Sequence, residues 1–229
     1  MNNILLSGLC VTSLLLGSTA AAQQGSTGPA IGVKAGTTGF GGEFIAPLSD
    51  ALNLRIGYSR LDYERDFDTD DVRYDGDITR NAASLVADWH PGSAAFRVSG
   101  GLYHHFDNEI DVTGRPGRTG SYEFNNRIYS SDDIGSIRGS GRFNKTTPYI
   151  GIGWGNATRG SAGVGFMAEL GLMYQGSASV RLSARDCRLP EALCTQLAED
   201  LREEARELED DINDYKWWPV LNLGIYLRF

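Results

Sequence analysis

The chain has 229 residues, of which 41% are hydrophobic, 10% are aromatic and 22% are charged, and its formal net charge is -8 at pH 7. A hydrophobic content near the globular norm excludes a disordered chain, and the acidic balance argues against nucleic acid or an anionic lipid surface as the main partner. The 29 glycines are spread through the chain, which excludes a collagen-like or low-complexity sequence.

The first segment is typical of a signal peptide. Residues 1–22 contain no Asp, Glu, Lys or Arg, and the apolar run from Ile4 to Leu16 is too short to span a membrane comfortably as a helix. Three alanines that end at Ala22 then provide a small-residue cleavage site. We therefore expect cleavage near Ala22 and a mature domain of residues 23–229.

The rest of the chain has the pattern of strands. No later segment has the roughly 20 apolar residues that a spanning helix needs. Apolar and polar residues instead alternate with a period of two, most clearly from Leu221 to Phe229. Eight strands are predicted, at residues 30–36, 39–48, 52–63, 77–90, 95–107, 145–155, 163–175 and 217–229. The first two are the weakest, because residues 30–48 could instead be one long strand, which would leave seven.

The connections between these strands differ in length at the two ends. The turns at one end are short: 49–51, 91–94 and 156–162. The connections at the other end are long, apart from the first: 64–76, 108–144 and 176–216. This segregation is typical of bacterial outer-membrane barrels, whose periplasmic turns are short and whose outer loops are long. The terminal Phe229 also resembles the membrane-insertion signal of such barrels, which implies the barrel-assembly machinery as a partner.

We therefore predict an all-β protein, an eight-stranded antiparallel transmembrane β-barrel with long outer loops. Its expected location is the Gram-negative outer membrane, in contact with lipid and lipopolysaccharide.

In a membrane barrel the apolar side chains face lipid and the polar side chains line the interior. On this parity the charged side chains that point inward are Lys34, Glu43, Arg55, Asp88, Arg97, Glu169 and Arg228. An eight-stranded barrel is only just wide enough for its own side chains, so these charges are expected to pair with one another. Two other interpretations stay open: the polar face could be the solvated surface of a soluble barrel, or some of these charges could gate a path for solutes.

The connection 64–76 is acidic. The spacing of Asp66, Asp68 and Asp70 is that of a calcium-binding loop, but Asp71 stands where such a loop needs glycine, and the last ligand position holds Asp77 instead of a glutamate. We favour a hydrated acidic loop and predict no metal site, with weak divalent bridging to lipopolysaccharide phosphates as the alternative.

The connection 176–216 contains a predicted helix at about residues 190–213. Its apolar side chains fall on one stripe: Leu193, Leu197, Leu201, Leu208 and Ile212. We favour a helix packed on neighbouring loops, and the alternative is a lid across the barrel mouth. Cys187 and Cys194 would meet an oxidising compartment after export, and two thiols without a nearby histidine make a poor zinc site, so we predict a disulfide.

Catalysis has little support in this sequence. The only histidines are His90, His104 and His105, and no Gly-x-Ser-x-Gly motif accompanies them. We expect no enzymatic activity and no cofactor.

Four motifs, in order and spacing, resemble the family of small outer-membrane barrels that includes the CarO-type proteins. They are Gly36-Thr37-Thr38-Gly39-Phe40-Gly41-Gly42, Pro148-Tyr149-Ile150-Gly151-Ile152-Gly153, Tyr174-Gln175-Gly176-Ser177 and Tyr215-Lys216-Trp217-Trp218-Pro219-Val220. The resemblance implies an eight-stranded barrel and, for CarO-type members, a proposed role in the uptake of small basic amino acids such as ornithine. It implies no particular site residues.

Two functions follow as hypotheses. In the first, which we favour here, the protein is a narrow or gated channel for small solutes such as basic amino acids, and its acidic outer loops concentrate small cations. In the second, it is a closed structural or adhesion barrel whose interior ion pairs block flow.

Overall fold

The computed structural model describes residues 27–68, 72–93, 95–116, 120–125, 127–214 and 216–229. The expected signal peptide, residues 1–22, and its cleavage near Ala22 lie outside these residues.

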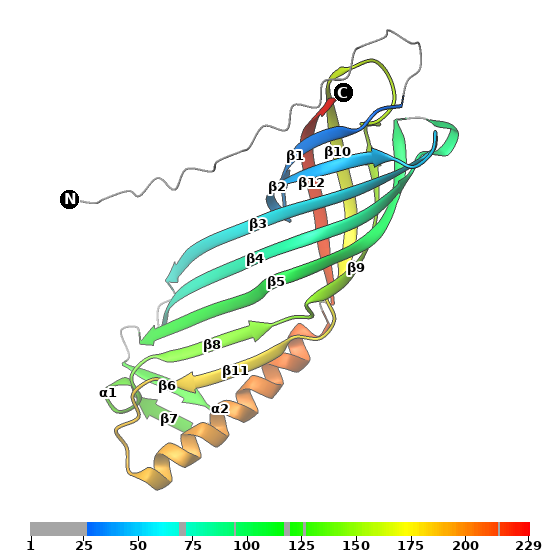
Figure 1. Cartoon of the computed structure of the whole chain (residues 1–229). Helices are drawn as coiled ribbons and strands as arrows, with labels where there is room; N and C mark the ends of the chain where they lie inside the picture. The colour runs from blue at the N-terminus through cyan, green and yellow to red at the C-terminus, as the bar shows by residue number, and fades with distance from the viewer. Residues whose placement is uncertain (1–26, 69–71, 94, 117–119, 126, 215) are drawn as a thin grey trace, which may run out of the picture.

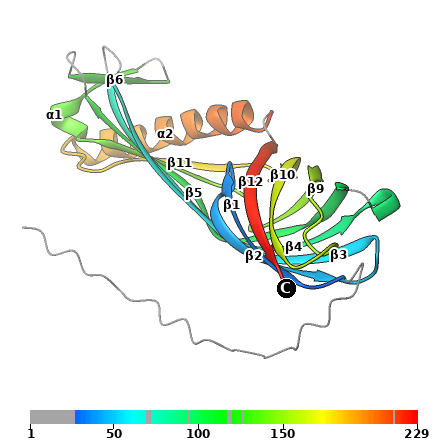
Figure 2. The same cartoon turned by 90° about the horizontal axis from the view of Figure 1, so that it is seen from above.

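Eight strands form a closed antiparallel barrel (Figures 1 and 2). They are β1 (Ala30–Gly36), β2 (Gly39–Pro47), β3 (Leu52–Asp68), β4 (Val72–Trp89), β5 (Phe96–Pro116), β9 (Thr146–Trp154), β10 (Gly163–Tyr174) and β12 (Trp217–Arg228). Each pairs with the next in this order, and β12 returns to pair with β1. The predicted fold class is therefore confirmed.

A tight hairpin separates β1 from β2. Gly36 pairs with Gly39 across the turn, and Gly39 has a φ of +91°, which favours glycine. The alternative of one long strand over residues 30–48 is therefore wrong.

The outward face of the barrel is apolar and its inward face is polar. The apolar side chains of Leu221, Leu223, Ile225 and Leu227 on β12 are between 41% and 65% exposed, whereas the intervening Asn222 is 2% exposed. Aromatic side chains gather near the ends of the wall, with Trp89 and Trp154 by the short turns. This is the arrangement of a barrel in lipid and the inverse of a soluble barrel, so the soluble interpretation is wrong.

Strand β5 pairs with two different strands along one of its edges. Its first part, from Phe96 to His104, pairs with β9 and closes the barrel. Its second part, from Glu109 to Gly114, pairs with β8 (Ile137–Arg142), which in turn pairs with β11 (Ser179–Ala184). The sheet thus continues past the barrel wall, as Figure 1 shows.

The connection 64–76 is mostly not a loop. Strands β3 and β4 stay paired up to Asp68 and Arg73, and residues 69–71 between them lie outside the described part of the chain. Polar composition indicates exposure to water, but it does not prevent antiparallel pairing of the backbone. The expected acidic loop is therefore largely a hairpin, and the calcium-like spacing falls on strand ends and undescribed residues.

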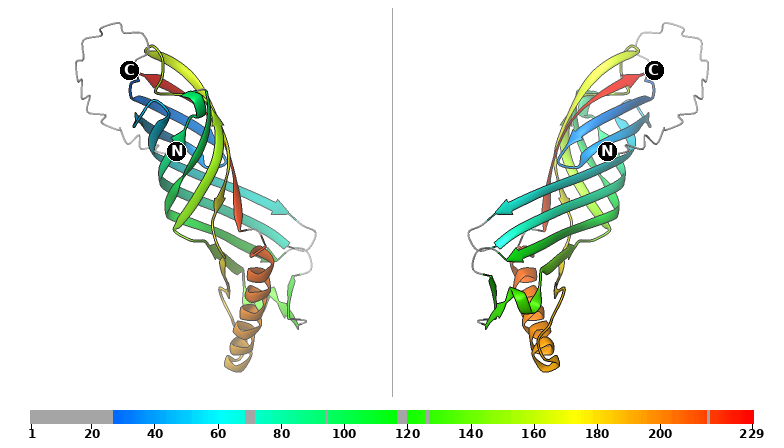
Figure 3. Two further views of the ribbon diagram at one scale, coloured as in Figure 1. Left: turned by 90° about the vertical axis from the view of Figure 1, so that its right-hand side faces the viewer. Right: turned by 90° about the vertical axis from the view of Figure 1, so that its left-hand side faces the viewer.

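The remaining elements lie beyond the two ends of the barrel wall. They are η1 (Pro91–Ser93) at the opposite, short-turn end, and β6 (Ser121–Phe124), β7 (Arg127–Ser130), α1 (Ser131–Ile134) and α2 (Glu191–Ile212) on the outer side. We call β6, β7, β8, β11 and α2 the outer platform. Figure 3 shows α2 beside β11, pointing away from the barrel and not across its mouth.

The outer platform has a small core of its own. Leu197 and Leu201 of α2 are buried against Tyr122, Ile134 and Ile137. The middle of the predicted stripe therefore packs on neighbouring outer segments, whereas Leu193 and Leu208 are exposed. None of the described helices is long and apolar enough to cross a membrane.

Candidate functional site

The candidate site is the interior of the barrel, which receives inward side chains from every wall strand. Six of the predicted charged residues lie here, each on a different strand and each at most 6% exposed. They are Lys34 of β1, Glu43 of β2, Arg55 of β3, Asp88 of β4, Arg97 of β5 and Glu169 of β10.

Arg55 is the centre of this group. Its Nε lies 2.7 Å from Asp88 Oδ2, and its Nη2 lies 2.8 Å from Glu169 Oε1. Its Nη1 lies 3.3 Å from Glu43 Oε2, which is also 3.1 Å from Lys34 Nζ. One guanidinium is thus shared by three carboxylates. We call Lys34, Glu43, Arg55, Asp88, Arg97 and Glu169 the lumen ion cluster.

Neutral side chains complete the hydrogen bonding of the cluster. Tyr149 donates to Glu169 over 2.6 Å, and Ser99 donates to Asp88 over 2.6 Å. Asn222 donates to Glu169 over 3.4 Å. The sequence interpretation missed these partners, although their inward parity in the strand pattern was a usable signal.

Arg97 and Arg228 are placed differently from Arg55. Arg97 Nε lies 3.6 Å from Asp88, and its Nη1 donates to the carbonyl of Gly155 over 2.9 Å. Arg228 does not join the ion cluster. Its guanidinium donates to the carbonyls of Asn156, Ala157 and Ser161, each over 2.8 Å, and so fixes the 156–162 turn. The expectation that all seven charges share one space is therefore wrong for Arg228, because it lies at the end of the barrel where turn carbonyls are nearer than carboxylates.

A second layer lies on the outer side of the ion cluster. It contains Ala82, Val86, Tyr103, Tyr149, Met173 and Val220, with Trp218 packed against it. The rings of Tyr103 and Tyr149 meet edge to face, 5.5 Å between centroids. The barrel is thus filled by an ionic layer and by an aromatic and apolar layer in series.

The short-turn end of the interior is also filled. Thr158 donates to Asn53 Oδ1 over 2.8 Å, and Asn53 Nδ2 lies 3.1 Å from His90 Nε2. These side chains are buried. His90 therefore has a packing role, and His104 instead lies exposed, 2.9 Å from Thr146.

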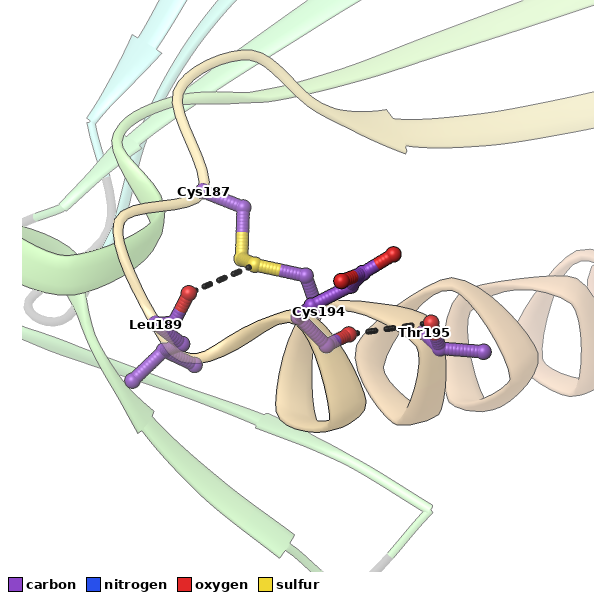
Figure 4. The surroundings of a disulfide bond; sticks show 5 residues. Cys187, Leu189, Cys194 and Thr195 are labelled. Carbon is purple, nitrogen blue, oxygen red and sulfur yellow. Dashed lines mark hydrogen bonds between the residues drawn. A yellow bond between two sulfur atoms is a disulfide. The ribbon is translucent and has the colours of Figure 1, made fainter.

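The disulfide joins Cys187 to Cys194, with 6.0 Å between their Cα atoms (Figure 4). It ties the segment after β11 to the first turn of α2, where Thr195 donates to the carbonyl of Glu191 over 2.9 Å. The predicted disulfide is therefore confirmed.

Asp200 of α2 anchors the β6–β7 hairpin. It accepts hydrogen bonds from Tyr129 over 2.5 Å, from Arg127 over 2.9 Å and from Asn125 over 3.3 Å. Burial acts to raise the pKa of Asp200, but these hydrogen bonds outweigh it and hold the pKa below its ordinary value.

Two further predictions concern Phe229 and metals. Phe229 continues the outward parity of β12 and is exposed, and its role in insertion stays a prediction. Among the residues that the structure describes, no group of three or more His, Cys, Asp and Glu side chains could hold a metal ion.

A closed antiparallel barrel with an apolar outer face, a filled polar interior and long connections at one end is the architecture of small bacterial outer-membrane barrels. This chain is such a barrel, and the outer membrane is its location.

Two solved structures from Acinetobacter baumannii share the fold. CarO is 25% identical, with 89% of this chain and 98% of that chain covered and a TM-score of 0.57. CarO2 is 24% identical, with 91% of this chain and 100% of that chain covered and a TM-score of 0.59. The resemblance to CarO-type barrels is therefore confirmed. No protein-family model matches this sequence, and no curated protein matches it.

Proposed function

We propose that this protein is a closed outer-membrane barrel that anchors a structural or adhesive platform at the cell surface. The observation that carries the proposal is the environment of Arg55, which is 2% exposed and pairs with three carboxylates from three other wall strands. A solute that crossed the barrel would have to separate these pairs and also displace the ring pair of Tyr103 and Tyr149.

The energetics support a closed state. Taking one partner away from a buried ion pair costs roughly 3–5 kcal/mol, and Arg55 pairs with three carboxylates, of which Glu169 has no other ion pair in the described residues. Spontaneous opening of the lumen is then a rare event.

The same proposal includes the export of the chain and its assembly into the outer membrane. A signal peptide of residues 1–22 would be removed near Ala22, and the barrel-assembly machinery would read the strand that ends at Phe229. Lipid and lipopolysaccharide would then contact the apolar wall. We propose no enzymatic activity.

Swelling of proteoliposomes tests the closed lumen. The protein is reconstituted and diluted into isotonic glycine, ornithine or arginine, with an open porin as the positive control. We expect the vesicles to swell no faster than protein-free vesicles. Swelling at a rate that scales with the amount of protein would overturn the proposal.

One observation favours a gated channel as the second candidate. Glu43, Asp88 and Glu169 together bind the guanidinium of Arg55. The same carboxylates could bind the cationic side-chain group of a basic amino acid. On this candidate the swelling rate would be higher for arginine and ornithine than for glycine. Glu169→Gln would abolish that preference.

A further inference from the structure

The outer end of the lumen contains a small cavity that the ion cluster does not use. It lies beyond the aromatic layer and measures about 10 Å³, which is roughly the space for one water-sized species. Its polar lining includes Thr37, Thr38, Ser59, Arg80, His105 and Trp218.

Arg80 is a buried cation without a carboxylate partner. It is 8% exposed, and its guanidinium stacks on the ring of Trp218, 4.4 Å from the ring centroid. Within the described part of the chain no ion pair forms on Arg80, and its Nη2 has no hydrogen-bond partner. The face of Trp218 attracts the cation but does not neutralise it.

His105 supplies a second unused polar atom to the same cavity. It is 3% exposed, and its Nε2 lies 3.1 Å from the hydroxyl of Thr147. Its Nδ1 has no partner among the described residues. The one hydroxyl proton of Thr147 can go to Nε2 over 3.1 Å or to the carbonyl of Tyr103 over 3.4 Å. When it goes to the nearer Nε2, the ring proton is on Nδ1, and Nδ1 is free to donate.

Two of the hydroxyls around the cavity already donate to other groups and are not available to an occupant. Thr37 donates to the carbonyl of Pro219 over 2.8 Å, and Thr38 donates to Asn222 over 2.9 Å. Ser59 has no such hydrogen bond in the described residues. Three donors therefore remain for an occupant: Arg80 Nη2, His105 Nδ1 and Ser59 Oγ.

The charge balance of the lumen points to the sign of that occupant. The buried cations are Lys34, Arg55, Arg80 and Arg97, and the buried carboxylates of the lumen are Glu43, Asp88 and Glu169. The described lumen thus has one positive charge in excess, and that charge is on Arg80. A buried charge is strongly unfavourable unless it is compensated.

We propose that this cavity binds one small monovalent anion, held by Arg80, His105 and Ser59 at the outer end of the lumen. The volume is that of a single small species, and among monovalent anions chloride and one carboxylate oxygen come nearest to that size. The anion neutralises Arg80 and satisfies the donors that the protein leaves unused.

Thermal unfolding of the purified full-length mature protein in detergent tests the site. Midpoints are compared at fixed ionic strength in the sodium salts of gluconate, chloride, bromide and acetate. We expect chloride and bromide to raise the midpoint by roughly 2–4 °C above gluconate, as a ligand bound only to the folded state does. An equal rise in acetate would identify carboxylates as ligands as well, and no rise in acetate would restrict the site to halides.

Variants assign the effect to the cavity. Arg80→Gln should remove the anion-dependent rise, whereas Arg142→Gln, which changes an exposed arginine paired with Glu109, should keep it. If Arg80→Gln does not fold, His105→Phe and Ser59→Ala retain the cation and should each reduce the rise. Crystals grown in bromide should show an anomalous peak beside Arg80.

Either of two results would overturn the proposal. The first is equal midpoints in all four salts, with a peak beside Arg80 that has no anomalous signal and is therefore water. The second is a chloride effect that persists in Arg80→Gln. Neither result bears on whether the lumen conducts, so failure here is separate from failure of the closed-barrel proposal.

Discussion

At the scale of single residues, Arg55 organises the interior of the barrel. Its guanidinium has three donor-bearing nitrogens, and the three carboxylates that surround it come from β2, β4 and β10. One side chain therefore links strands that are not neighbours in the wall. Such a hub is more sensitive to truncation than a surface arginine, because its loss leaves Glu169 without an ion pair and leaves three buried carboxylates to share Lys34 and Arg97.

Arg55→Leu should lower the free energy of unfolding by roughly 3–5 kcal/mol. Urea unfolding in detergent, followed by the gel shift between folded and unfolded bands, measures the change. The control is Arg142→Leu, an exposed arginine, for which we expect a change within about 0.5 kcal/mol. Equal stability of both variants would show that the ion cluster is not a structural hub.

Inward glycines make room for the large side chains of the lumen. A Cβ built on Gly153 would lie 2.7 Å from Arg97 Nε, whereas one on Gly100 would have 3.9 Å to its nearest neighbour. Gly153→Ala should therefore destabilise the barrel by about 1–3 kcal/mol, and Gly100→Ala should not. The same unfolding measurement decides, and a larger loss for Gly100→Ala would contradict the packing described here.

At this scale, the strand parity predicted six of the cluster residues but could not predict their partners. Parity gives the face of the wall on which a side chain lies, not its depth along the barrel axis. Arg228 has inward parity, yet its depth places it against the carbonyls of a turn. Arg80 lies in the predicted strand 77–90 with the same inward parity as Asp88, so the pattern could have placed it in the lumen, and the sequence interpretation missed it.

At the scale of elements, the outer platform grows out of the barrel wall. Strands β3, β4 and β5 run on past the closed part of the barrel, and β8 and β11 extend the sheet from β5. The sequence predicted the membrane part of each strand because hydrophobic alternation is strong there. It did not predict the continuation, although Ile110 and Val112 of β5 alternate with polar residues there and face the same pocket as Leu182 of β11.

The disulfide should matter to the platform and not to the barrel. Cys187→Ser with Cys194→Ser frees the segment that leads into α2, while every wall strand stays paired. We expect faster proteolysis between residues 185 and 195 and an unchanged gel shift for the barrel. Loss of the gel shift would show that the disulfide is needed for the barrel itself.

The Asp200 anchor should respond to acid. Because the pKa of Asp200 is lowered in the folded protein, its contribution is present above its unfolded pKa of about 3.9 and is lost as the pH falls through the folded value. Protease sensitivity of the β6–β7 hairpin should rise at pH values below about 4. Asp200→Asn should raise that sensitivity at pH 7 and flatten its pH dependence; an unchanged profile would contradict the anchor.

At the scale of the whole molecule, the barrel and the outer platform are structurally distinct parts. The wall provides an apolar band for lipid, and the interior is filled in two layers. The long connections between wall strands form the outer platform. Loop lengths and strand count predicted this polarity. Whether the interior is filled could not be predicted, because the same inward charges would serve a closed barrel or a gated path.

Single-channel recording in a planar bilayer tests the closed lumen most directly. The purified protein is inserted at physiological salt and held across a range of voltages, beside an open porin as the positive control. The ion cluster and the aromatic layer predict a flat baseline without openings. Reproducible current steps from the unmodified protein would contradict a barrel that its own side chains close.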